Sequence, residues 1–222
     1  MDDQRTITAI EPQRRKGRMN IYLDGEFVMG VSEEVVAALY LGVGQRITED
    51  RLALIVHDET LTKARDRAYL LLSYRARSER EIRDRLSRAG YEEGIVQEVV
   101  EKLYALGFLD DKVFAESFIR NRAATRPEGR RALTHELRSK GVDARTVAEA
   151  TAGMDAEAER EAALAAARSR VERWRGLERL EARRKAVGFL QRRGFTWDTI
   201  ISVLDAILPS SHVDEVSDND IS

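Results

Sequence analysis

Cysteine is absent from this chain of 222 residues, which excludes disulfides, thiolate metal sites, iron–sulfur clusters and cysteine nucleophiles. Proline is scarce, with three in the whole chain, so long helices can form without interruption. No apolar run approaches the length of a membrane span, and the opening MDDQRTITAI lacks the apolar segment of a signal peptide. We therefore expect a soluble, cytoplasmic protein with no membrane partner.

The net charge is also close to zero, at −2, because 37 basic residues nearly balance 39 acidic ones. The overall charge therefore gives no argument for nucleic-acid binding. Six of the 37 basic residues are lysines and the rest are arginines. Arginine suits forked contacts to phosphate or carboxylate, but genome composition produces the same bias, and both interpretations stay open.

Catalytic constellations are missing as well. The histidines, His57, His135 and His212, have no carboxylate at metal-ligand spacing. Gly42-Val-Gly44 lacks the third glycine and the preceding strand of a dinucleotide-binding turn, and no phosphate loop is present. We therefore expect no catalytic residue, no metal, no cofactor and no enzymatic activity.

The first 60 residues differ from the rest because they contain strand-like runs. Asp24-Gly25 is a hairpin-turn signal, and Ser32 and Thr48 are typical helix caps. We predict an N-terminal extension over residues 1–60 that contains a β-hairpin and accompanying helices. Its expected strands are Ile7–Ile10, Met19–Leu23 and Glu26–Val31, and its expected helices are residues 33–40 and Glu49–His57.

A helical pattern follows and repeats three times. Each repeat contains Leu-x-x-x-Gly, at Leu86–Gly90, Leu137–Gly141 and Leu190–Gly194, and the glycines are 51 and 53 residues apart. Glycine suits the position just after a helix, where a positive φ is required. We therefore predict a mainly α fold: a curved, elongated tandem array of three three-helix repeats in which the three leucines are equivalent core residues.

The repeats have predictable limits. Ser78 and Glu81 form a capping box, Asp110 or Asp111 and Asp143 can cap further helices, and the third repeat opens with a long helix over Ala158–Trp174. The last residues carry four acids and no base between His212 and Ser222. The predicted limits are residues 61–109, 110–154 and 155–208 for the repeats and 209–222 for an acidic disordered tail.

The basic residues gather in the second helix of each repeat. The position ten residues before the repeat glycine is arginine each time: Arg80, Arg131 and Arg184. If the repeats stack alike, these side chains form a row that fits a long polyanion or an acidic protein groove. The alternative is a solvated face of arginine-rich helices. A helical wheel also puts Arg131, His135 and Arg138 opposite Leu133 and Leu137.

Two further interpretations concern nucleic acid. The aromatic residues Tyr69, Tyr74, Phe114, Phe118, Phe189 and Trp197 have the chemistry to stack on bases, although helical spacing favours core packing for most of them. A three-helix unit also has the form of a helix-turn-helix that reads a major groove. The acidic pair Glu92-Glu93 at the start of one third helix argues against its entry into a groove.

Several motifs occur together between residues 60 and 208. They are Tyr69-Leu-Leu-Leu-Ser73, Arg77-Ser78-Glu79-x-Glu81-Ile82, Leu86-x-x-x-Gly90, Gly107-Phe-Leu-Asp-Asp111 with Phe114-Ala115, and then Arg122, Gly129 and Glu136-Leu137-x-x-x-Gly141. As a set they resemble the signature of the RecX family, bacterial regulatory proteins that act on the RecA recombinase. The N-terminal hairpin is similar to an extension found in some members.

The resemblance implies a fold of three tandem three-helix repeats and binding in the groove of the RecA–single-stranded-DNA filament. It implies a modulator, expected to inhibit filament extension, ATP hydrolysis and strand exchange, that also binds single-stranded DNA. Double-stranded DNA is a further candidate partner, a monomer is expected, and a helix-turn-helix DNA-binding regulator is the alternative. The candidate binding residues are Arg77, Arg80, Arg88, Arg122, Arg126, Arg131, Arg138, Arg184 and Arg192.

Overall fold

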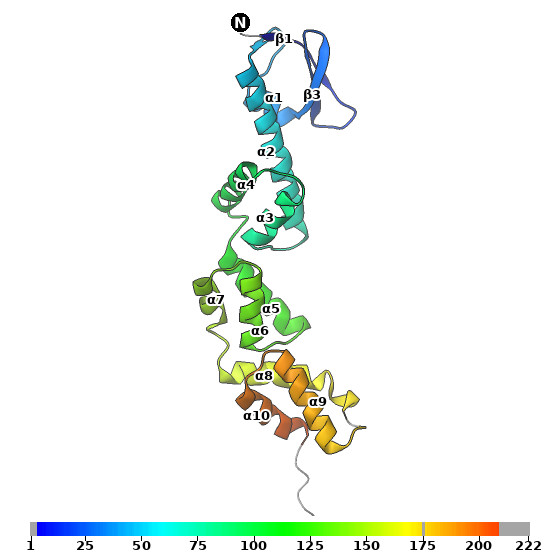
Figure 1. Ribbon diagram of the computed structural model, residues 1–222, viewed down its shortest axis with the longest axis vertical. Coiled ribbons are helices and arrows are strands. Elements are labelled where there is room, and N and C mark those ends of the chain that lie inside the picture. The colour runs from blue at the N-terminus through cyan, green and yellow to red at the C-terminus, as the bar shows by residue number, and fades with distance from the viewer. Residues whose placement is uncertain (1–3, 175, 209–222) are drawn as a thin grey trace, which may run out of the picture. The chain divides into compact units, whose positions relative to one another are not determined.

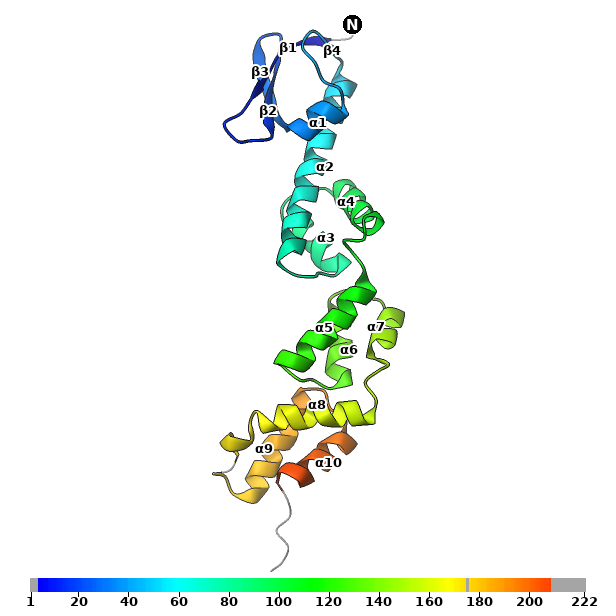
Figure 2. The same ribbon diagram turned by 180° about the vertical axis from the view of Figure 1, so that it is seen from behind.

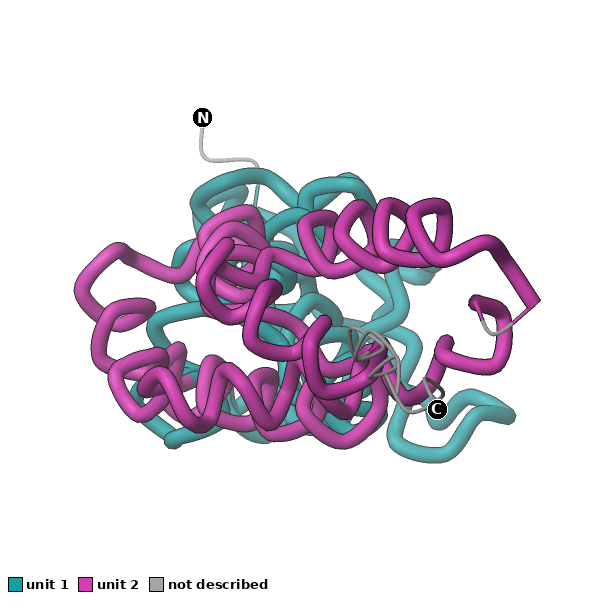
Figure 3. The backbone as a smooth tube through the Cα atoms, turned by 90° about the horizontal axis from the view of Figure 1, so that it is seen from below, with its two compact units in different colours: residues 1–109 teal, residues 110–222 magenta. Residues whose placement is uncertain are grey.

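The computed structural model describes residues 4–174 and 176–208 (Figure 1). The chain divides into two compact units, residues 1–109 and 110–222, which are coloured separately in Figure 3. Unit 1 holds a small sheet and one three-helix domain, and unit 2 holds two three-helix domains. The predicted acidic tail, residues 209–222, lies outside the described residues.

Unit 1 begins with an antiparallel sheet whose strand order is β3-β2-β1-β4. The hairpin between β2 and β3 turns at Asp24 and Gly25, which both have positive φ, at 51° and 87°. This pair of angles suits the right-handed twist of the strands, so the predicted hairpin is confirmed. The strands are β1 (Arg5–Pro12), β2 (Arg18–Leu23), β3 (Glu26–Ser32) and β4 (Arg46–Ile47).

Two helices accompany the sheet. The short helix α1 (Glu33–Ala38) begins after Ser32, whose side chain accepts a hydrogen bond from the Val35 N–H at 3.2 Å. Thr48 caps α2 (Glu49–Tyr74) in the same way. The predicted end of this second helix at His57 is wrong, because residues 49–74 contain no glycine or proline that would stop it.

The long helix α2 is shared by two hydrophobic cores. Ile55, in its first half, packs with the sheet residues Ile7 and Val31. Ala64 and Ala68, in its second half, belong to the core of the first three-helix domain. One uninterrupted helix therefore joins the sheet to this domain, and it runs without a break through residue 60, where the N-terminal extension was expected to end (Figure 1).

The three-helix domains follow the predicted pattern. Leu86, Leu137 and Leu190 are all fully buried, which confirms them as core residues. Gly90, Gly141 and Gly194 have φ of 88°, 87° and 77°, as the turn after a helix requires. The remaining helices of the first domain are α3 (Glu79–Ser87) and α4 (Glu93–Ala105), and those of the second are α5 (Asp111–Thr125), α6 (Arg130–Ser139) and α7 (Ala144–Thr151).

The third domain opens differently from the prediction. Its first helix, α8 (Ala156–Arg168), ends six residues before Trp174, the predicted end, and a short 3₁₀ turn, η1 (Val171–Arg173), follows. The Ser169 hydroxyl donates to the Ala166 carbonyl at 2.6 Å, which competes with helix continuation. Trp174 is thereby buried, with its ring 5.8 Å from that of Phe189. Helices α9 (Arg179–Arg192) and α10 (Trp197–Ile207) complete the domain, and α8 packs against α10 (Figure 2).

Within unit 2 the second and third domains meet backbone to backbone. The Gly129 N–H, at the start of α6, donates to the Arg193 carbonyl at 2.8 Å, and the Arg193 guanidinium donates to the Pro127 carbonyl at 3.1 Å. A Cβ on Gly129 would lie 2.3 Å from the Gly194 carbonyl oxygen, and one on Gly194 would lie 2.4 Å from the Ala132 nitrogen. This close approach fixes the position of α6 relative to the end of α9.

Candidate functional site

The second helix of each three-helix domain presents free arginines to solvent. In α3, Ile82 and Leu86 are buried, which turns Arg80 and Arg88 outward. In α6, Leu133 and Leu137 are buried, so the predicted outward position of its arginines and histidine is confirmed. Six of the nine predicted binding arginines are exposed and make no salt bridge within residues 4–174 and 176–208: Arg80, Arg88, Arg131, Arg138, Arg184 and Arg192.

The other three predicted arginines are engaged inside the protein. Arg77 is half-buried, and its Nε donates to the Leu71 carbonyl at 3.0 Å, just before α3 begins. Arg122 and Arg126 both pair with the carboxylate of Glu128. Arg126 is exposed as well, so the arginines with groups free for a partner are the six that make no salt bridge with a described residue.

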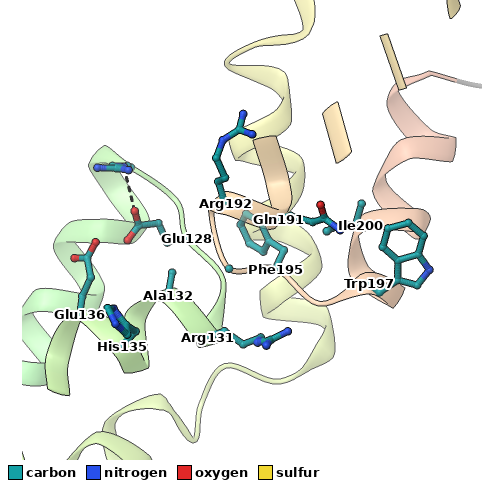
Figure 4. Close-up of a pocket in the computed structure, with 12 residues that line it drawn as sticks. Glu128, Arg131, Ala132, His135, Glu136, Gln191, Arg192, Phe195, Trp197 and Ile200 are labelled. Atoms are coloured by element: carbon teal, nitrogen blue, oxygen red, sulfur yellow. Dashed lines mark ion pairs between the residues drawn. The ribbon is translucent and has the colours of Figure 1, made fainter. Parts of the chain in front are cut away.

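A cavity of about 570 Å³ lies in unit 2, between the second and third domains. Arg131 and His135 of α6 line it from one side, and Gln191 and Arg192 of α9 line it from the other (Figure 4). The indole of Trp197, at the start of α10, stands at its edge with 57% of the residue exposed. The cavity thus brings free guanidinium groups and an accessible aromatic face together.

The backbone contact between the two domains positions this cavity. Gly194 and Ala132, which meet at that contact, also line the cavity wall. Helix α6 begins at this point without a side-chain cap, because Gly129 is its N-cap residue. The lining side chains of α6 and α9 are therefore held at a defined separation, as a preorganised binding site requires.

A buried carboxylate, Glu128, also lines this cavity, together with Glu136. Its side chain is 2% exposed, and its Oε1 lies 3.0 Å from the Nε of Arg126. Arg122 bridges Glu128, with its Nε 3.6 Å from Oε2, to Glu136, whose Oε2 lies 2.5 Å from Nη2. The Arg122 guanidinium also lies 5.0 Å from the centre of the Phe118 ring. Arg122 is thus held by two carboxylates and an aromatic face.

The environment of Glu128 is unusual for an ion-paired acid. Burial, followed by repulsion from the Glu136 carboxylate, raises the pKa of Glu128, and the guanidinium groups of Arg122, Arg126 and Arg193 only partly offset this. The Oε2 atom has no hydrogen-bond donor among the described residues. This cluster therefore costs desolvation energy and fixes geometry more than it adds stability.

Sequence reasoning missed Glu128 as the partner of two predicted binding arginines. The pairing depends on the loop between α5 and α6, which returns Glu128 to Arg122 and Arg126, and neither helical spacing nor a motif encodes it. In the sequence, Trp197 stands out only as one of several aromatic residues. The feature of the sequence that points to its exposure is its place directly after the cap residue Thr196. Trp197 is the first residue of a helix, where side chains tend to be exposed.

Within residues 4–174 and 176–208, no three histidine, aspartate or glutamate side chains gather as a metal ion would require. None of the helices described is both long and apolar enough to cross a membrane.

These features define a class: a mostly helical protein with a small N-terminal sheet and three tandem three-helix domains. The family descriptions match this division. "Regulatory protein RecX N-terminal domain" matches residues 5–48, and the first, second and third three-helix domains of RecX match residues 64–103, 110–150 and 157–204. The chain belongs to the RecX family of regulatory proteins, as its motifs predicted.

Individual relatives agree with the family models. The chain is 32% identical to a regulatory protein RecX of Bacillus velezensis over 200 residues, 90% of this chain and 76% of the relative. It is 30% identical to the one of Clostridioides difficile, over 91% of this chain and 95% of the relative. A crystal structure of a regulatory protein RecX superposes with a TM-score of 0.73 at 29% identity and covers 90% of this chain and 99% of that one.

Proposed function

We propose that this protein binds the RecA–single-stranded-DNA filament and inhibits its extension, ATP hydrolysis and strand exchange. It acts as a monomer in the cytoplasm and by binding alone, without catalysis of its own. Membership of a family of regulatory proteins supports the proposal at the level of class. The proposal that it binds and inhibits the RecA filament rests on the surface that the second helices present to solvent.

The observation that carries the proposal is the set of free guanidinium groups around the cavity of unit 2. Arg131 and Arg192 line this cavity and make no salt bridge with any residue of 4–174 or 176–208, and Trp197 adds an exposed ring. The carboxylates that also line it, Glu128 and Glu136, are paired with Arg122 and Arg126 instead. Such groups suit phosphates, carboxylates and unstacked bases, which a protein filament on single-stranded DNA presents together. Contacts repeated over tandem domains add through effective concentration, so each can be weak.

A helix-turn-helix DNA-binding regulator is the second candidate. In each three-helix domain, however, an acid lies at or next to the start of the third helix: Glu93 in α4, Asp143 before α7 and Asp198 in α10. A recognition helix presents this end to base edges between two phosphate backbones, where negative charge is repelled. The observations therefore favour the filament.

The arginines of the predicted row give the first test. Replacement of Arg80, Arg131 and Arg184 by alanine is expected to weaken inhibition of the RecA ATPase on single-stranded DNA. The free energy of unfolding should change by no more than about 0.5 kcal/mol per site, because all three side chains are exposed. Where an arginine contacts a strand phosphate, its loss lowers the slope of log affinity against log salt by about 0.7.

A matched control removes the same charge from the first helix of each domain. Arg67, Arg120 and Arg168 are exposed on α2, α5 and α8. Their alanine variant should inhibit RecA almost as the unchanged protein does. Equal inhibition by both triple variants would show that the row on the second helices has no special role.

A further inference from the structure

A second cavity, of about 530 Å³, lies within the third domain, and five of its eight lining residues are cationic. Its lining residues come from the segment after α8 and from α9, and none of them is acidic. They are Arg170, Arg173, Trp174, Arg184, Lys185, Gly188, Phe189 and Arg192. Arg184 and Arg192 are among the residues predicted from the sequence, whereas Arg170 and Arg173 are not.

Most of this positive charge makes no salt bridge in the described part of the chain. The Lys185 ammonium lies 2.8 Å from the Glu181 carboxylate. The four arginines make no salt bridge with any described residue. Like charges in one cavity repel each other, and an anion bound between them relieves that repulsion.

The aromatic rings of Trp174 and Phe189 fix the position of one cavity-lining arginine. The Arg170 guanidinium lies 5.6 Å from the centre of the Phe189 ring, and Trp174 meets the same ring edge to face. Gly188 leaves the surface of α9 open there. A Cβ at this position would lie 3.3 Å from the Nη1 of Arg192, so the missing side chain gives this guanidinium room beside the cavity.

The two cavities of unit 2 share a residue, since Arg192 lines both. A strand that passes over Arg192 would have the Trp197 indole for a base on one side and the arginine-walled cavity for its phosphates on the other. Aromatic stacking combined with a cationic track is the general mode of single-strand binding. Forked guanidinium groups also match phosphate oxygens in pairs.

We propose that the cavity lined by Arg170, Arg173, Arg184 and Arg192 is a phosphate-binding site for the backbone of a single-stranded nucleic acid. The inference rests on the proposed function only in taking that strand to be the DNA of the filament. The site itself is testable without RecA.

The test measures binding of the full chain to a fluorescently labelled oligothymidylate by anisotropy over a range of salt concentrations. The Arg170→Ala/Arg173→Ala variant should bind about tenfold more weakly or worse, as loss of hydrogen bonds to charged groups implies. Its slope of log affinity against log salt should fall by about 1.4, because two phosphate contacts are lost and each accounts for about 0.7. Gly188→Leu, which fills the cavity without a change of charge, should weaken binding as well.

The matched control is Arg168→Ala/Arg179→Ala, which removes two exposed arginines of the same domain that do not line the cavity. Melting curves by circular dichroism check that every variant folds. Equal weakening by the two double variants would overturn the site, because it would show a general charge effect. If tripolyphosphate competes as effectively as unlabelled oligothymidylate does, the site recognises phosphate groups in general. That result would overturn the proposal that its ligand is a nucleic-acid strand.

The same proteins are then assayed for inhibition of the RecA ATPase, which separates the two proposals. If the unchanged protein binds oligothymidylate but does not inhibit the RecA ATPase, the proposed function is wrong and the phosphate site is still supported. Inhibition without any oligothymidylate binding would overturn the phosphate site and support the proposed function.

Discussion

Replacement of Glu59 by alanine is expected to lower the free energy of unfolding of unit 1 by about 3–5 kcal/mol, as loss of one partner of a buried ion pair does. Glu59 is 3% exposed, on the long helix α2. Its carboxylate accepts hydrogen bonds from the Arg18 guanidinium and from the Ser32 N–H at 2.6 Å, and it lies 3.1 Å from the Lys63 ammonium. The alanine variant leaves Arg18 half-buried without its partner.

Native-state hydrogen exchange of the β2 and β3 amides measures this effect locally. The control is Glu26→Ala, since Glu26 pairs with Arg5 at 3.3 Å but is 82% exposed, and its loss should cost about 0.2–1 kcal/mol. Equal losses of protection in the two variants would show that Glu59 is not the link between the sheet and α2.

The same residue predicts a dependence on pH. Burial alone would raise the pKa of Glu59, but the hydrogen bonds from Arg18, Ser32 and Lys63 outweigh it, so the pKa lies below its ordinary value of 4.5. The ionised form is therefore favoured by folding. Its stabilising contribution is present above about pH 4.5 and is lost as the pH falls through the lowered pKa. Glu59→Gln should remove this part of the acid sensitivity.

Gly194→Ala is expected to separate the second and third domains. The new Cβ would lie 2.4 Å from the backbone nitrogen of Ala132, which no rotation of a side chain relieves, and φ is +77°. Overpacking costs about 1–3 kcal/mol, and a left-handed conformation costs a non-glycine residue about 1–2 kcal/mol more. The cavity lined by Arg131, Arg192 and Trp197 should lose its shape along with the contact.

Gly90→Ala is the matched control, because Gly90 has a φ of +88° and open space around it. It carries the backbone strain without the clash. Thermal unfolding and the tryptophan emission, to which Trp174 and Trp197 both contribute, should change clearly more in Gly194→Ala than in Gly90→Ala. If the two variants behave alike, the backbone contact does not hold the domains together.

The sequence predicted those parts of the fold that depend on local spacing. The Leu-x-x-x-Gly period identified Leu86, Leu137 and Leu190 as buried, and Asp24-Gly25 identified the hairpin. No glycine or proline stops α2 past His57, but its full length also depends on packing into two cores, which local spacing does not show. That arrangement includes the Glu59–Arg18 pair, whose partners lie 41 residues apart.

The candidate site was predictable to a similar degree. Helical periodicity separates outward arginines such as Arg131 and Arg184 from the core, and both are exposed. It cannot show that Arg122 is paired, because its partners, Glu128 on a loop and Glu136 on α6, reach it only in the folded domain. Nor could it find Arg170 and Arg173 beside α9, since they follow a helix end that depends on the burial of Trp174.

The most direct test of the central claim compares affinity for three targets at one salt concentration: the assembled RecA–single-stranded-DNA filament, the same bare single strand, and a duplex of the same sequence. We expect the tightest binding to the filament, because guanidinium groups repeated over tandem domains contact protein and strand there at the same time. The duplex should bind most weakly and without sequence preference. Tight, sequence-selective binding to the duplex, with no gain on the filament, would contradict the account.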